Sequence, residues 1–224
     1  MSSISVSGVV LAGGKSRRFG SDKRRAHFHG KSLLANACEK IAGTIGENAD
    51  KGSLGISISA DEDPSVFLSD VLGPALVASD KHPSDFHIIS DLQADVGPLG
   101  GIYSSLAACE TDWILVLAVD LPGVSDATLT TMVERINKAH NPQLLAVVAE
   151  DTSGAIHPLI GCYNQGLRPY IEQAISERKT GIRRLLHSIE LLPGASRIAR
   201  LTLPDIELHN INFAGDVSTS TDRI

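Results

Sequence analysis

Two hydrophobic patterns alternate along the chain, and each predicts a different kind of element. Continuous apolar runs of strand length, rich in β-branched residues, are typical of strands buried on both faces of a parallel sheet. Such runs lie at 113–119 and 144–149 and, interrupted by Ser, Gly or His residues, at 4–12, 55–59, 86–90 and 157–163. Between them, apolar residues recur at helical spacing and predict helices over 32–45, 97–109, 126–139, 167–176 and 181–186. Strands that alternate with helices predict a three-layer α/β/α fold of the Rossmann-like type, with a mostly parallel sheet.

Residues 61–84 interrupt this alternation. The stretch from Asp61 to Pro64 can open a short helix that continues to Leu68, because proline is well tolerated in the first turn of a helix. From 75 to 83, serine and proline residues predict a loop on the surface rather than a further helix.

Length and composition are those of a globular protein. With 224 residues, of which 42% are hydrophobic and 21% charged, the chain can bury one sizeable core, and we expect a single domain over 1–224. Its longest apolar run, 113–119, is far shorter than the roughly 20 residues of a membrane-spanning helix. The N-terminus lacks the basic, apolar and cleavage regions of a secretory signal, so we expect a cytoplasmic protein that makes no membrane contact.

The three cysteines, Cys38, Cys109 and Cys162, are too widely separated for any C-x-x-C pair. An odd number of cysteines without metal-ligand spacing argues against a disulfide framework and against a structural zinc site. We therefore expect three small, buried, hydrophobic side chains.

Positive charge is concentrated at the beginning of the chain. Residues 1–31 contain seven Lys or Arg and one Asp, so an overall charge of −6 leaves −12 for the remaining 193 residues. A long nucleic acid usually requires a broad basic face, whereas one basic loop on an acidic protein favours a small anionic ligand. We therefore expect no nucleic-acid partner.

The basic residues follow a pair of glycines, Gly13 and Gly14, at the end of the first predicted strand. Gly14 begins a Gly-Lys-Ser, but a Walker loop would require glycine at position 9, where the residue is Val9. In the second Gly-Lys-Ser, at 30–32, Arg25 occupies the position of the required glycine, and the dinucleotide pattern G-x-G-x-x-G is absent. Glycines at a strand end can still bring backbone N–H groups close to an anion, although a plain glycine turn followed by solvated charges would look the same.

Asp120 lies where the apolar run 113–119 ends, and Pro122 stops that strand. Ligands of open parallel sheets bind beyond the carboxyl ends of the strands, and a carboxylate there is a suitable oxygen ligand for Mg²⁺. A single aspartate in this position could also simply cap the next turn. Together with a glycine-and-cation loop, however, it provides the minimal equipment for displacement at phosphorus. No Ser-His-Asp or Cys-His arrangement can be placed, so we assign no protein nucleophile.

These residues resemble a known family. LAGGKSRRFGSDK, at 11–23, is similar to the N-terminal signature L-A-G-G-x-S-R-R-x-G-x-D-K of the molybdenum cofactor guanylyltransferases, a family of nucleotidyltransferases. Further similarities follow in the same order along the chain: GPLGGI at 97–102, LAVDLP at 117–122, HPLIGCY at 157–163 and NINFAGD at 210–216. The resemblance therefore spans almost the whole chain.

The resemblance implies a nucleotidyltransferase fold, with a nucleotide-binding half at 1–110 and a metal and pterin half at 111–224. The implied reaction transfers GMP from GTP to the phosphate of molybdopterin and releases pyrophosphate, with Mg²⁺ as cofactor. The implied nucleotide-binding residues are Leu11, Ala12, Gly13, Gly14, Lys23, Ser59, Asp91 and Asp120, and Asp120 would also hold the metal. Candidate catalytic residues are Lys23, Asp120 and Arg17. Possible partners besides the two substrates are the molybdenum cofactor insertion machinery and apo-molybdoenzymes, in transient contacts.

The chain departs from the family pattern at two places. Ser59 stands where the family usually has Asn, and Phe213-Ala214-Gly215 replaces Thr-Pro-Glu in the C-terminal motif. A cytidylyltransferase for the same cofactor remains an alternative, although its signature usually begins A-A-G. The same residues are also compatible with a related sugar-phosphate nucleotidyltransferase, and with a catalytically silent homologue that binds nucleotide during molybdoenzyme maturation.

Overall fold

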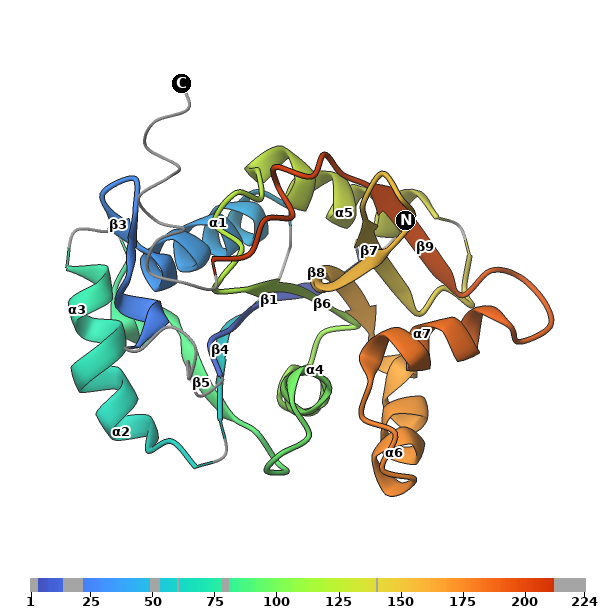
Figure 1. Ribbon diagram of the computed structural model, residues 1–224, viewed down its shortest axis with the longest axis horizontal. Coiled ribbons are helices and arrows are strands. Elements are labelled where there is room, and N and C mark those ends of the chain that lie inside the picture. The colour runs from blue at the N-terminus through green and yellow to red at the C-terminus, as the bar shows by residue number, and fades with distance from the viewer. Residues whose placement is uncertain are drawn as a thin grey trace.

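A seven-stranded sheet with the order β5-β4-β1-β6-β8-β7-β9 forms the centre of the molecule (Figure 1). The computed structural model describes residues 4–13, 22–48, 53–59, 61–77, 81–139 and 141–211. The strands are β1 Val6–Leu11, β4 Leu54–Ile58, β5 His87–Ser90, β6 Trp113–Ala118, β7 Ala146–Glu150, β8 Ile156–Asn164 and β9 Ile198–Thr202. Only β8 runs antiparallel to its neighbours β6 and β7, and every other pair in the sheet is parallel. The predicted mostly parallel sheet is therefore confirmed.

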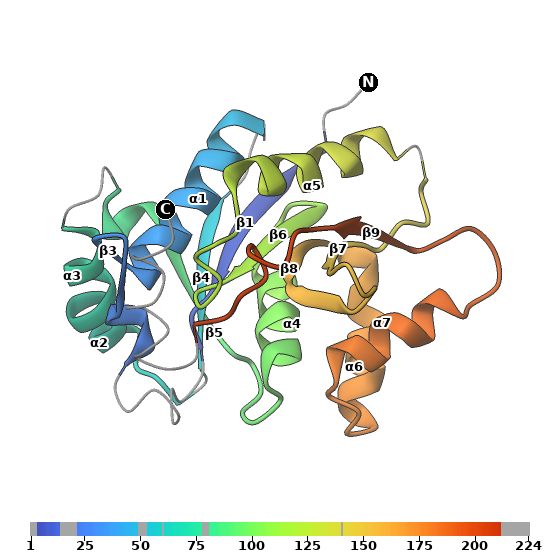
Figure 2. The ribbon, with the colours of Figure 1, turned by 45° about the horizontal axis from the view of Figure 1, so that its top comes forward.

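Helices cover both faces of the sheet, which confirms the predicted three layers (Figures 1 and 2). One face carries α1 Leu33–Asn48 and α5 Asp126–Lys138, which also pack against each other. The other face carries α4 Pro98–Ala108, α6 Arg168–Ser176 and α7 Ile182–Glu190. None of the helices in the described part of the chain combines the length and apolar character that a bilayer-spanning helix requires. The division into halves at 1–110 and 111–224 stays a prediction.

The continuous apolar runs became strands because both of their faces are covered by helices. All six residues of β1 and all six of β6 are buried. Gly8 shows how closely one layer approaches the next, since a Cβ atom on it would lie 2.3 Å from Cγ2 of Ile41 in α1. Helix α1 begins where the sequence predicts, and the Ser32 hydroxyl accepts a hydrogen bond from the Ala35 N–H at 3.1 Å. The three cysteines are buried and free, as expected.

The segment 61–77 differs from its prediction. Asp63 caps a helical run that begins as expected, but the run continues through α2 Pro64–Val66, a π-helical stretch Phe67–Leu72 and α3 Gly73–Leu76. The predicted loop at 75–83 is therefore wrong at its beginning, where Leu76 is buried. Apolar side chains on one side of this run pack into the core, and Pro74 lies in the first turn of α3, where a missing N–H is tolerated.

Three further strands are absent from the sequence prediction: β2 and β3, which form a hairpin, and β9. In the hairpin, β2 His27–Phe28 and β3 Lys31–Ser32 are only two residues long each. The chain turns between them at His29 and Gly30, which both have positive φ angles. Strand β9 lies at the edge of the sheet, where it pairs only with β7 and stays half-exposed. Such a strand lacks the continuous apolar run that marks the central strands.

The segment that follows β9 returns to the loop after β6 (Figure 2). The Ile211 N–H donates a hydrogen bond to the backbone oxygen of Asp120 at 2.9 Å. The Glu207 carboxylate accepts hydrogen bonds from the Ser125 N–H at 3.1 Å and from the Thr128 hydroxyl at 2.7 Å, both at the beginning of α5. The chain after β9 therefore supports the loop that carries Asp120. Within the C-terminal motif at 210–216, residues 212–216 lie outside the described residues.

Replacing Glu207 by Ala is expected to lower the free energy of unfolding by about 1–2 kcal/mol, since it removes a carboxylate that caps a helix N-terminus. For a chain of this size, each kcal/mol corresponds to a melting temperature lower by about 2–4 °C, which differential scanning calorimetry resolves. Asp205→Ala, an exposed neighbour in the same segment, is the matched control. Equal melting temperatures for the two variants would contradict a capping role for Glu207.

Candidate functional site

A cavity of about 650 Å³ lies beyond the carboxyl ends of β1, β4, β5 and β6. Six of the predicted site residues line it: Leu11, Gly13, Lys23, Ser59, Asp91 and Asp120. Ala12 is buried, and its backbone N–H donates a hydrogen bond to the backbone oxygen of Ser57 at 2.9 Å. Gly14 and Arg17 lie outside the described residues. The structure thus brings together residues from four segments that the sequence could only list separately.

Lys23 and Asp120 are in direct contact in this cavity. The Lys23 Nζ atom lies 2.7 Å from Asp120 Oδ2, and the two side chains are only 19% and 11% exposed. Asp120 is held at the end of β6, where the Val119 N–H donates to the backbone oxygen of Leu11 in β1. Lys23 comes from a single 3₁₀ turn, η1 Lys23–Arg25, that follows the glycine loop. A cation and a carboxylate are therefore placed at one point of the cavity wall from positions 97 residues apart.

Ser57 is a cavity residue that the sequence analysis missed. Its hydroxyl donates a hydrogen bond to Asp91 Oδ1 at 3.2 Å. Gly101 of α4 lies directly against this pair, because a Cβ atom there would be 3.0 Å from Ser57 Oγ. Ser57 and Ser59 are two positions apart, so both can point to the same side of β4. That alternation was the available signal, but the prediction included only Ser59.

Replacing Asp91 by Asn is expected to leave the protein at least as stable at pH 7. Burial raises the pKa of the Asp91 carboxyl group, and the hydrogen bond from Ser57 offsets part of this effect. A carboxyl group with a raised pKa in the folded state destabilises that state when ionised, and this cost disappears as the pH falls through the folded pKa toward the unfolded value. Asn carries no such cost at pH 7. Thermal unfolding of the variant at pH 7 measures this, and a clearly lower melting temperature would contradict it.

The described part of the cavity wall is predominantly acidic. Asp61 and Asp95, which were not predicted, line the cavity together with Asp91 and Asp120, whereas Lys23 is the cation that the described residues contribute. An anionic ligand therefore needs a second source of positive charge on the Asp120 side. The cations Lys15, Arg17 and Arg18 of the glycine loop lie outside the described residues.

Asp120 could bind a Mg²⁺ ion whose other ligands are water molecules and phosphate oxygens. Among the described residues there is no group of three or more His, Cys, Asp or Glu side chains that could enclose a metal ion. Mg²⁺, however, usually takes one or two protein carboxylates and completes its octahedral shell with water and phosphate oxygens. A single buried carboxylate beside a cavity of about 650 Å³ is compatible with an ion that arrives with a nucleotide.

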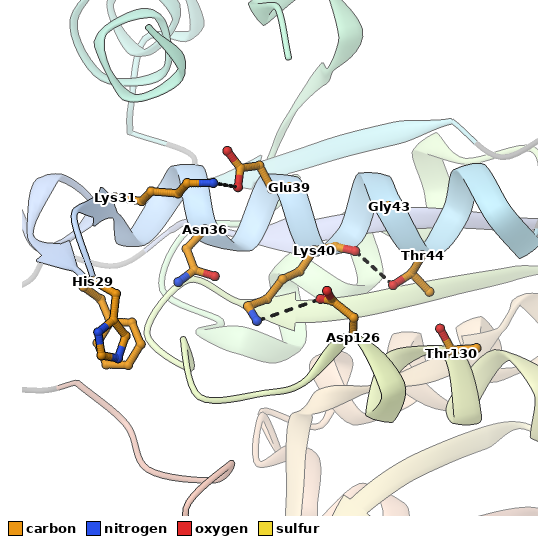
Figure 3. A pocket seen from close by; sticks show the side chains of 10 residues that line it. His29, Lys31, Asn36, Glu39, Lys40, Gly43, Thr44, Asp126 and Thr130 are labelled. Atoms are coloured by element: carbon orange, nitrogen blue, oxygen red, sulfur yellow. Dashed lines mark hydrogen bonds and ion pairs between the residues drawn. The ribbon is translucent and has the colours of Figure 1, made fainter. Parts of the chain in front are cut away.

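A second pocket, of about 390 Å³, lies between the hairpin, α1 and α5 (Figure 3). Its charged side chains already face one another: Lys31 Nζ lies 2.5 Å from Glu39 Oε2, and Lys40 Nζ lies 3.9 Å from Asp126 Oδ1. Charges that neutralise each other leave little net attraction for an anion, and the pocket lies on a helical face rather than at the strand ends. We therefore take the strand-end cavity as the candidate site.

Comparisons with known proteins agree with the fold and with the family resemblance. A family model described as "MobA-like NTP transferase domain" matches residues 8–192. A probable molybdenum cofactor guanylyltransferase of Thermococcus kodakarensis is 30% identical over 179 residues, which cover 78% of this chain and 74% of that protein. The crystal structure of molybdopterin-guanine dinucleotide biosynthesis protein A from Archaeoglobus fulgidus superposes with a TM-score of 0.68 at 21% identity, covering 96% of each chain. A Mycobacterium tuberculosis protein crystallised with manganese has the same fold, with a TM-score of 0.57 at 18% identity and 89% coverage of both chains.

Proposed function

Because the chain belongs to the MobA-like NTP transferase family and is therefore a nucleotidyltransferase, we propose that it transfers GMP from GTP to the terminal phosphate of molybdopterin. The reaction releases pyrophosphate and uses Mg²⁺. The observation that carries the proposal is the contact between Lys23 and Asp120 at the carboxyl ends of the strands. The name of the Thermococcus kodakarensis relative supports the choice of substrates.

The transfer is a displacement at phosphorus. An oxygen of the molybdopterin phosphate attacks the α-phosphorus of GTP in line, the bond from the α-phosphorus to the bridging oxygen breaks, and pyrophosphate leaves. Such a transition state spreads negative charge over the phosphoryl oxygens, so fixed cations and N–H donors provide most of the catalysis. Lys23 would turn from Asp120 toward these oxygens, and the Gly13 backbone would donate to them. Mg²⁺, held by Asp120, would supply further positive charge against the phosphates when bound.

The carboxylates of the cavity wall are better suited to bind the guanine base of GTP than its phosphates. Guanine presents two donors side by side, N1–H and the N2 amino group, whereas the corresponding edge of cytosine has one amino group and two acceptors. The Asp91 carboxylate can only accept hydrogen bonds when ionised, and so complements the guanine edge. A cytosine there would leave acceptors facing the carboxylate, which a polar site rejects strongly. In the proposed complex, the phosphates would lie toward Lys23 and Asp120, and the base toward Asp91.

A pyrophosphate-release assay tests the proposal. The purified protein is incubated with Mg²⁺ and molybdopterin, together with GTP, CTP or ATP in separate reactions, and the dinucleotide product is identified by mass spectrometry. With molybdopterin present, the expected result is pyrophosphate release and product formation from GTP but not from CTP or ATP. No pyrophosphate should be released from GTP when molybdopterin is left out. Preference for CTP would replace guanine by cytosine in the proposal. The absence of transfer with all three nucleotides would support the catalytically silent homologue instead.

A further inference from the structure

Arg24, the residue next to Lys23, is clamped between two carboxylates. Its Nη1 and Nη2 atoms lie 2.8 Å from the two oxygens of Glu62, while Nε and Nη2 lie 2.8 Å from the two oxygens of Asp22. The guanidinium group also lies 5.2 Å from the centre of the Phe67 ring, and the side chain is only 12% exposed. We name Arg24, Asp22, Glu62 and Phe67 the Arg24 clamp.

The Arg24 clamp joins three segments that border the candidate site. Asp22 precedes Lys23 in the chain, and Arg24 Nη1 also donates to the backbone oxygen of Ala12, at 3.4 Å, where β1 ends. Glu62 follows β4, and its N–H donates to the backbone oxygen of Ser59 at 3.0 Å. The ends of β1 and β4 and the η1 turn with Lys23 are thus tied to one side chain.

The neighbouring Arg25 strengthens the same connection. Its Nη2 atom donates to the backbone oxygen of Asp70 at 2.6 Å, in the π-helical stretch. The helical run 64–76 therefore meets the η1 turn at two places, through Phe67 beneath Arg24 and through Asp70 beside Arg25. The helical run 64–76, for which the sequence predicted no function, therefore holds the η1 turn in position.

We propose that Arg24 is a positioning residue, which holds the η1 turn so that Lys23 reaches Asp120 and the incoming phosphates. Two carboxylates already neutralise the guanidinium group, so Arg24 is not available as a phosphate ligand in this arrangement. The planar guanidinium group, with five N–H donors, can form bidentate hydrogen bonds with both carboxylates at once, which a lysine ammonium group cannot do. The catalytic part of this inference rests on the proposed function, whereas the placement of Lys23 does not.

The test compares Arg24→Ala and Arg24→Lys with Arg200→Ala. Arg200 is a matched control, because it lies far from the cavity at the sheet edge and also binds two carboxylates, Glu190 at 2.8 Å and Glu150 at 3.3 Å. The first readout is kcat/KM for GTP in the pyrophosphate assay. The second is the rate of acetylation of Lys23 in the protein without nucleotide, measured by mass spectrometry relative to Lys138 in the same molecule.

Both Arg24 variants are expected to lose about a hundredfold in kcat/KM, the effect of an ångström-scale displacement of a catalytic group, and Lys is not expected to rescue the loss. Acetylation of Lys23 should become several-fold faster, because its amine is then less often held against Asp120. Arg200→Ala should change neither quantity. In a double-mutant cycle, Arg24→Ala and Glu62→Ala together should lose less than the sum of the single losses.

Unchanged Lys23 acetylation and a kcat/KM equal to that of Arg200→Ala would overturn the proposal, as would full rescue by Arg24→Lys. If Arg24→Ala does not fold, Glu62→Gln takes its place, with the same changes expected at smaller size. Faster Lys23 acetylation in a protein whose wild type transfers no nucleotide would support the Arg24 clamp while refuting the proposed function. Normal transfer by the wild type, with no change in kcat/KM or in Lys23 acetylation in the Arg24 variants, would refute the role of the Arg24 clamp but not the proposed function.

Discussion

Replacing Asp120 by Asn is expected to lower kcat by about a hundred- to a thousandfold, the loss that follows removal of one fixed electrostatic group from a catalytic site. Asn keeps the shape of the side chain but removes the negative charge that would hold a divalent ion against the phosphates. The remaining activity should require a higher Mg²⁺ concentration than the wild type. The measurement is the rate of pyrophosphate release from GTP as a function of Mg²⁺, at saturating molybdopterin.

The fold should survive this substitution. Asp120 takes part in the fold through its backbone oxygen, which accepts the Ile211 N–H, and Asn leaves that bond in place. Asp126→Asn is the matched control, because Asp126 is a carboxylate six positions further along that is 76% exposed and lines the second pocket instead. A wild-type rate and wild-type Mg²⁺ dependence for Asp120→Asn would remove Asp120 from the site. A similar loss of rate in Asp126→Asn would point to a general defect.

Asp120 and the glycine loop were predictable because their signals are local. A buried strand that stops at an aspartate, or at two glycines, places those residues at the carboxyl end of a parallel sheet wherever the strand lies in the order. The contact between Lys23 and Asp120 was not predictable, since it depends on β1 and β6 being neighbours with Leu11 beside Ala118. Only the assembled sheet brings the η1 turn after β1 close to the end of β6.

The features that the sequence analysis missed depend on partners that are distant in the chain. Arg24 belongs to a run of charges, and such a run usually forms a solvated surface. Its position instead depends on Glu62 and Phe67, which come from a segment whose helical part was underestimated. Strand β9 was missed for a related reason. Its Arg200 binds Glu150 and Glu190, so a half-polar strand is stabilised at the sheet edge by ion pairs rather than by an apolar run.

Replacing Lys23 by Met should separate catalysis from metal binding. Without the ammonium group, the developing charge on the phosphates loses its fixed cation, and kcat/KM for GTP is expected to fall by about a hundred- to a thousandfold. The same change removes the cation that lies 2.7 Å from Asp120 Oδ2 in the protein without nucleotide. A divalent ion that approaches Asp120 then no longer competes with an internal counter-charge.

The variant should therefore bind Mn²⁺ more tightly than the wild type when no nucleotide is present, by up to about fivefold, which corresponds to the roughly 1 kcal/mol of a partly exposed ion pair. Titration followed by the electron paramagnetic resonance signal of free Mn²⁺ measures this affinity directly. Lys31→Met is the matched control, because the Lys31–Glu39 pair has similar geometry but lies outside the cavity. Tighter Mn²⁺ binding together with slower transfer in Lys23→Met, and neither change in Lys31→Met, would support a metal ion that shares Asp120 with Lys23. Unchanged Mn²⁺ affinity in Lys23→Met would show that the ion is held elsewhere, and Asp120 would then act on the reaction without binding the metal.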